Sequence, residues 1–212
     1  MTVQAPQNNL LVKIGDVFLK RVSAIVKVTA AHAKNTKMNP ADLVQIIGTV
    51  VSVPRGCKDR AGIVGYTAKD VKVGDAVVFR YDVVYDFDMK HQKWRNMFYY
   101  KGQEYWVCDI VKAFFIIRNE EIIMLNGYCM VEAIAEPPKI HLPSHMRNIS
   151  QIGSALLTHI DAPLEGAKPI NAKVGDTVYF VPKRVQRYEI RGKPFGIIRQ
   201  QDIMGAKISE LI

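Results

Sequence analysis

The chain has 212 residues, of which 49% are hydrophobic and 23% are charged, and its formal net charge is +9. This composition excludes a wholly disordered chain and supplies enough apolar side chains for one large or two small cores. The positive charge admits an acidic partner such as nucleic acid, an anionic membrane or an acidic protein surface, but the Lys and Arg residues are scattered, which fits an ordinary solvated surface equally well.

The cysteines and the N-terminus bear on the compartment. Cys57, Cys108 and Cys129 form no C-x-x-C pair and are odd in number, which argues against a disulfide scaffold and for a reducing compartment. Residues 1–9 lack a signal pattern, and the most apolar run, residues 107–117, is far shorter than the roughly 20 residues that a membrane span needs. We therefore expect a soluble cytoplasmic protein, found in the host cytoplasm or the virion if it is viral.

In chain order, the first third predicts strands separated by loops. Residues 10–22 alternate well enough for a strand, whereas residues 23–40 place a short apolar group before a small, polar and basic tail, typical of a weak helix or a mobile loop. Residues 43–53 predict a strand that Gly48 interrupts with a bulge or bend, and the Gly- and Pro-rich residues 54–66 predict a surface hairpin or loop.

A Gly-Asp turn leading into a buried strand is the best-defined local feature. Residues 70–79 read DVKVGDAVVF, and nearly the same sequence returns as NAKVGDTVYF at residues 171–180. We interpret Asp75 and Asp176 as turn residues rather than acid catalysts, because an Asp side chain readily bonds its neighbouring backbone.

Residues 81–107 mix aromatic, acidic and basic side chains, and predict a long two-stranded arm with its turn near residues 90–93. Its aromatic residues include Trp94, Phe98, Tyr99 and Tyr100. Cationic and aromatic side chains together suit a contact with a neighbouring subunit, a solvated hairpin or a nucleic-acid stacking surface. We favour the subunit contact.

The rest of the chain predicts further strands and a domain boundary. The strands are expected at 104–117, 121–134, 154–160, 187–190, 195–199 and 202–208. Paired prolines at 137–138 cannot sit inside a sheet and predict a linker. The fold class is therefore all-β, because no long helical pattern occurs. We expect two domains, 1–136 with the loop 23–40 and the arm 81–107, and 137–212.

The two halves predict an internal repeat of strand, turn-rich loop, Lys-Val-Gly-Asp strand, Ile-Ile strand and final strand. In this alignment Ile122 corresponds to Ile197, and residues 126–134 correspond to residues 202–208. The arm is then an insertion in the first half, and the second half lacks a counterpart of the loop 23–40.

The order of these motifs resembles that of GroES-type (chaperonin-10) co-chaperonins, the small β-barrel lids of chaperonin rings. The matching stretches are Gly48-Thr-Val50, the loop 54–66, Lys72 to Phe79, Glu121 to Met124 and Val131 to Ile134. The resemblance covers most of residues 10–134 and, more faintly, 139–212. It implies two GroES-like β-barrels in tandem, the first with a mobile loop and an inserted β-arm.

The same resemblance implies a partner. Residues 23–36 resemble the family's mobile loop, whose short apolar tripeptide docks on the apical domain of a chaperonin. In this chain the tripeptide corresponds to Ile25, Val26 and Lys27. Lys27 departs from the apolar residue that the family has at the third position, and Val28 can substitute for it. The implied function is a homo-oligomeric co-chaperonin that binds a GroEL-type ring and assists protein folding without a cofactor of its own.

Enzymatic functions find no support in the sequence. Lys-Val-Gly-Asp also marks the barrel of medium-chain alcohol dehydrogenases, but the G-x-G-x-x-G turn, the helices and the clustered zinc ligands of those enzymes are missing. His141 and His145 would lie about 13 Å apart on a strand, too far for one metal ion. No catalytic constellation occurs, so we expect neither an enzyme nor a metal site.

Two further hypotheses belong to other classes. A structural, oligomer-forming β-barrel protein, such as a viral capsid decoration or joining protein, suits the long arm and the single loop. A basic nucleic-acid binder is less favoured and predicts binding that weakens steeply with salt. A membrane partner is not expected.

Overall fold

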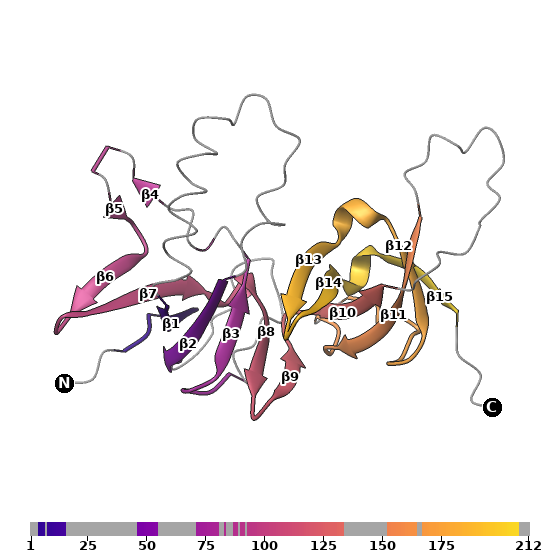
Figure 1. The fold of residues 1–212 in the computed structure, drawn as a ribbon, viewed down its shortest axis with the longest axis horizontal. Coiled ribbons are helices and arrows are strands. Elements are labelled where there is room, and N and C mark those ends of the chain that lie inside the picture. Colours follow the sequence, from indigo (N-terminus) through magenta and orange to yellow (C-terminus); the bar gives the residue numbers. More distant parts are fainter. Residues whose placement is uncertain are drawn as a thin grey trace. The chain divides into compact units, whose positions relative to one another are not determined.

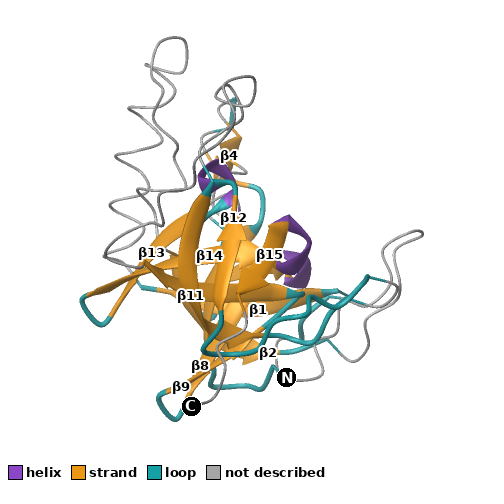
Figure 2. Ribbon diagram, turned by 90° about the vertical axis from the view of Figure 1, so that its right-hand side faces the viewer, coloured by secondary structure: helices purple, strands orange, loops and turns teal. Residues whose placement is uncertain are grey.

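The computed structural model describes residues 4–6, 8–15, 46–54, 71–80, 83, 87–88, 90–91, 93–133, 152–164 and 167–207. Within these residues every regular element is a β-strand or a short 3-10 helix, as Figures 1 and 2 show. The chain divides into two compact units, Met1–Asn126 and Gly127–Ile212. The predicted all-β class is therefore confirmed.

The described part of the chain holds no helix with the length and apolar character required to cross a lipid bilayer.

The first unit is a seven-stranded antiparallel sheet in the order β6-β7-β1-β2-β3-β8-β9. Its strands are β1 (Asn9–Ile14), β2 (Ile46–Ser52), β3 (Ala76–Phe79), β6 (Met97–Tyr100), β7 (Gln103–Asp109), β8 (Ala113–Arg118) and β9 (Glu121–Met124). The 3-10 helix η4 (Ile110–Lys112) joins β7 to β8, and a separate hairpin pairs β4 (Phe87–Asp88) with β5 (Lys93–Trp94).

Strand β1 is covered on both faces. Leu10 and Val12 belong to the main core of the first unit, whereas Leu11, which points to the opposite face, packs with Ala5 and Tyr105. We call this second group, which also contacts Phe98, Tyr100, Val51 and Val107, the satellite cluster. Its position explains why β1 is a nearly continuous apolar run rather than an alternating one.

The second unit is a six-stranded antiparallel sheet in the order β13-β14-β10-β11-β12-β15. Its strands are β10 (Tyr128–Ala133), β11 (Gly153–Ile160), β12 (Thr177–Phe180), β13 (Gln186–Ile190), β14 (Lys193–Arg199) and β15 (Ile203–Lys207). The 3-10 helices η6 (Pro182–Arg184) and η7 (Gln200–Asp202) precede β13 and β15.

The two sheets share one pairing scheme, in which β10 takes the place of β1. Val12 lies opposite Trp106 of β7, and Val131 lies opposite Gly196 of β14 in the same way. The register shifts after Leu11 in β1 and after Met130 in β10. Shared bulges fix the alignment residue by residue, because a bulge displaces the register at one defined position.

The expected role of β10 is thereby corrected. Residues 126–134 were expected to close the first half, but β10 pairs with β11 and β14 and belongs to the second sheet. Cys129 and Val131 explain this, because they pack into the core of the second unit beside Leu157 and Val178. The division of the chain accordingly follows Asn126, while the prolines at 137–138 lie outside the described residues.

The expected insertion is corrected as well. Strands β6 and β7 correspond to β13 and β14, and both hairpins turn through two residues of positive φ, Lys101-Gly102 (51° and 72°) and Arg191-Gly192 (53° and 77°). Only the part of the arm that carries the β4–β5 hairpin is additional. Likewise β15 corresponds to β8, since each follows a 3-10 helix and pairs with the Gly-Asp strand. The alignment of Ile122 with Ile197 is wrong.

The new alignment also changes the view of the loops. The segment between β10 and β11 has the same topological position as the segment between β1 and β2, which contains residues 23–40. The second half therefore has a counterpart of that connection, although both segments lie outside the described residues. In the described pairings no ladder joins the two edge strands of either sheet, so the described residues establish two antiparallel sheets.

Candidate functional site

The residues predicted for partner binding fall into two groups. Ile25, Val26, Lys27 and Val28 lie outside the described residues. The predicted subunit-contact residues Trp94, Phe98, Tyr99 and Tyr100 lie on β5 and β6 and can be examined one by one.

Trp94 packs inward. It is partly buried against the main core of the first unit, and its ring centroid lies 5.5 Å from that of Trp106 at an interplanar angle of 55°. Trp106 is fully buried and its Nε1 donates a hydrogen bond to Oε1 of Glu104 at 2.7 Å. Trp94 therefore secures the β4–β5 hairpin to the core, a tilted aromatic contact of the favourable kind.

Phe98 and Tyr100 lie on the face of β6 that points away from the main core, and both pack against the satellite cluster. Phe98 stacks on Tyr105 with ring centroids 5.7 Å apart. Lys101 Nζ lies 5.6 Å from the centre of the Tyr100 ring, and Lys13 Nζ lies 5.3 Å from that of Tyr105. These aromatic faces are therefore engaged by neighbouring rings and cations of the same unit.

Tyr99 is the most exposed of the four aromatic residues. Its side chain is 68% exposed, and its hydroxyl donates a hydrogen bond to Oε2 of Glu104 at 3.2 Å. It lies on β6, which is an edge strand of the first sheet. An exposed aromatic residue on an edge strand of the described sheet suits a protein contact, while the carboxylate of Glu104 beside it disfavours a nucleic-acid backbone.

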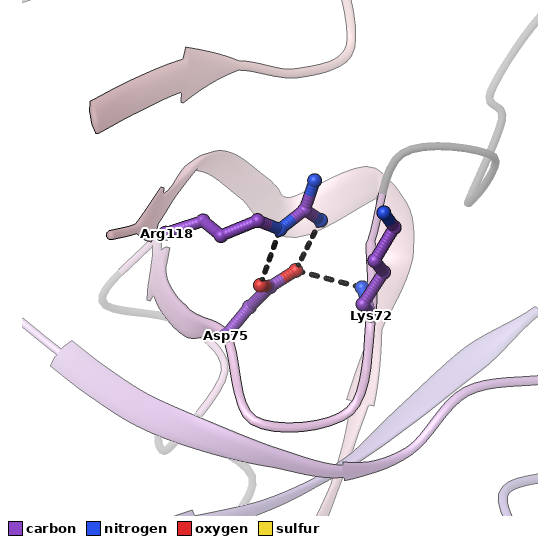
Figure 3. Close-up of polar contacts among 3 residues, drawn as sticks. All are labelled: Lys72, Asp75 and Arg118. Atoms are coloured by element: carbon purple, nitrogen blue, oxygen red, sulfur yellow. Dashed lines mark hydrogen bonds and ion pairs between the residues drawn. The ribbon is translucent and has the colours of Figure 1, made fainter. Parts of the chain in front are cut away.

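The Gly-Asp turn of the first unit is a polar anchor (Figure 3). One carboxylate oxygen of Asp75 accepts a hydrogen bond from the backbone N–H of Lys72 at 2.7 Å, and Arg118 contacts both oxygens at 2.8 and 2.7 Å. Burial alone would raise the pKa of Asp75, but the hydrogen bonds from Arg118 and Lys72 outweigh it, and the pKa lies below its ordinary value of 3.8. The ion pair ties the turn before β3 to the end of β8.

The second unit repeats the turn. Asp176 is buried and accepts a hydrogen bond from the backbone N–H of Lys173 at 2.9 Å. In both units the backbone around the aspartate also bonds β2 or β11, at Val50 and Leu157 respectively. Asp75 and Asp176 thus bond their neighbouring backbone, as the sequence predicted.

The buried cysteines are poor nucleophiles. Burial raises the pKa of the Cys108 thiol well above its usual range, and burial together with nearby Asp161 raises that of Cys129 to about 12. No cluster of three or more His, Cys, Asp or Glu side chains suited to a metal ion occurs among the described residues.

Sequence reasoning missed the residues of β1 and β7 that engage this aromatic group, namely Lys13, Glu104, Tyr105 and Trp106. Lys13 lies on β1 and the other three are consecutive residues of β7, so their roles depend on the pairing of strands far apart in the chain. No protein-family model matches the sequence, and no curated protein matches it.

Proposed function

We propose that the chain is a tandem, GroES-like co-chaperonin that binds a chaperonin ring and assists protein folding without chemistry of its own. Docking is assigned to Ile25, Val26, Lys27 and Val28 in the connection between β1 and β2. The carrying observation is the duplication, in which two units share strand order, bulges and Gly-Asp turns. It supports two GroES-like barrels in one chain.

The proposed mechanism is multivalent docking. A short apolar segment that orders on binding loses conformational entropy, so each contact is weak. Several copies in one homo-oligomer convert later contacts into intramolecular ones and strengthen the whole assembly. The connection between β10 and β11 gives each chain a second segment in the same topological position.

The test is co-sedimentation of the full chain with a GroEL-type chaperonin in the presence of ATP. The Ile25→Asp variant is expected to lose binding, because a charge replaces the apolar docking group. Val174→Asp is the matched control, since Val174 is 54% exposed and lies in the Gly-Asp turn of the second unit. Equal binding by the wild type and Ile25→Asp, or no binding by either, would contradict the proposal.

A second candidate is a structural protein of an assembly such as a viral capsid, with β6 as the contact edge. The exposure of Tyr99 on that edge supports it. A particle-bound fraction that Tyr99→Ala reduces, together with no affinity for a chaperonin, would favour this candidate over the first.

A further inference from the structure

A pocket of about 330 Å³ lies in the second unit. It is lined mainly by apolar residues of β10, β11, β12, β14 and the segment before β13, together with the hydroxyl-bearing Ser154, and Arg187 is its one charged lining residue. Its volume lies at the lower end of the range of small-molecule sites. The first unit shows what occupies the equivalent place there.

The alignment of the two sheets identifies that occupant. In the first unit Val12, Trp106 and Met97 are successive cross-strand neighbours on one face. In the second unit the same three positions hold Val131, Gly196 and Arg187. The indole of Trp106, fully buried in the first unit, therefore has no counterpart in the second.

The second unit also lacks the side chains that cover this part of the core in the first unit. Trp94 and Met97 pack on the core beside Trp106 in the first unit. The corresponding connection in the second unit is only the short helix η6 and Val185. A Cβ atom on Gly196 would lie 2.6 Å from Cγ1 of Val185 and 2.9 Å from Cγ2 of Val131, so these two valines take the space directly beside Gly196, and both also line the pocket.

The lining has a definite chemistry. Val131, Ala155 and Phe180 are buried apolar walls, and they suit a planar ring. Arg187 is exposed at the rim, at the position of the uncharged Met97, where its guanidinium can pair with an anion. An apolar space of this size beside one cation fits a ring that carries a carboxylate.

We propose that this pocket binds a small aromatic carboxylate, with its ring in the space that corresponds to the Trp106 indole and its carboxylate on Arg187. The proposal is independent of the co-chaperonin function, since it involves neither the connection between β1 and β2 nor a chaperonin.

The test uses indole-3-acetate as the probe and the full chain labelled with ¹⁵N. Titration is expected to shift the amide signals of Val131, Ala155 and Gly196 saturably. An absence of saturable shifts at a probe concentration of about 10 mM, ten times a weak dissociation constant of about 1 mM, would overturn the proposal. Shifts confined to the first unit would overturn it as well.

Two variants separate the contribution of the carboxylate to binding from that of the ring. Arg187→Gln is expected to weaken indole-3-acetate binding about tenfold while leaving the binding of uncharged indole unchanged, because only the charge-assisted contact is lost. Arg184→Gln is the matched control, since Arg184 is exposed and does not line the pocket. Equal losses in the two variants would show general attraction of an anion to a basic protein and overturn the proposal.

A third variant fills the pocket. Val185→Phe places a larger side chain beside Gly196, and the folded variant is expected to bind neither indole nor indole-3-acetate. Undiminished binding by a folded Val185→Phe protein would contradict the location. If this variant does not fold, Arg187→Gln still decides the outcome.

Discussion

Three cross-strand positions that correspond in the two units carry different side chains. In the first, Val12, Trp106 and Met97 form part of a dense core onto which Trp94 also packs. In the second, glycine replaces the indole at Gly196, and a pocket lies at this place. The strand order and bulges survive this exchange, so the frame depends on pairing and on the Gly-Asp turn more than on any particular core side chain.

The outer ends of the sheets differ in a related way. Strand β8 buries Phe114 and Phe115 completely and pairs with β9 on its far side. The corresponding β15 has exposed Met204 and Gly205 and is an edge strand. Among the described residues the first unit therefore contains the larger apolar core, and we expect its stability to depend more strongly on single aromatic residues.

The largest effect is expected from Trp106→Ala. Removing a fully buried indole should lower the free energy of unfolding of the first unit by about 3–5 kcal/mol. Urea unfolding followed by circular dichroism measures this. Tryptophan fluorescence is unsuitable as the probe, because Trp94 and Trp106 are the only tryptophans and the substitution itself removes one of the two fluorophores. Trp94→Ala, at a partly buried position, should cost less. If Trp106→Ala lowers the free energy of unfolding by no more than Trp94→Ala does, the indole of Trp106 is not the central side chain of this core.

A smaller effect is expected when the anchor of the Gly-Asp turn is cut. Arg118→Ala removes both contacts to the buried Asp75 carboxylate and should cost about 1.5–3 kcal/mol, the range of hydrogen bonds to charged groups. The same urea unfolding measures it. Arg184→Ala, at an exposed arginine of the second unit, should stay within about 0.5 kcal/mol. Similar costs in both variants would argue against the ion pair as an anchor.

The same anchor predicts a pH dependence. Because the folded pKa of Asp75 lies below 3.8, its contribution to stability is complete above the unfolded pKa and is lost as the pH falls through the folded pKa. Unfolding curves of the wild type between about pH 6 and pH 3 should therefore show a loss that is smaller in Arg118→Ala. Parallel losses in the two proteins would contradict this.

The smallest effect on stability is expected from Tyr99→Ala. Because Tyr99 is 68% exposed, the free energy of unfolding should change by no more than about 0.5 kcal/mol. Sedimentation velocity should nevertheless show weaker self-association if β6 is a subunit contact. A destabilised variant with unchanged self-association would place Tyr99 in the packing of its own unit instead.

Local features of the fold were predictable from the sequence. The Asp75 and Asp176 turns followed from residue type and spacing, because an aspartate side chain acts on its own neighbouring backbone. The strand character of Val77 and Phe79, both fully buried, followed from their β-branched and aromatic side chains.

The pairing of distant strands was not predictable. Runs such as Ile122-Ile123 and Ile197-Ile198 suit many positions in an antiparallel sheet, so their likeness misaligned the halves. The contact between Trp94 and Trp106 was missed because the predicted arm combines two different parts. Trp106 belongs to a strand of the main sheet, whereas Trp94 belongs to the additional β4–β5 hairpin. The pocket was hidden for the opposite reason, since Gly196 has no likeness to Trp106 and only the pairing makes them equivalent.

The most direct test of the duplicated frame is a set of cross-strand nuclear Overhauser contacts in the labelled full chain. We expect backbone contacts between Val131 and Gly196 in the second unit and between Val12 and Trp106 in the first, at matching positions after the two bulges. Contacts from Val131 to strands of the first unit, with none to Gly196, would contradict the account.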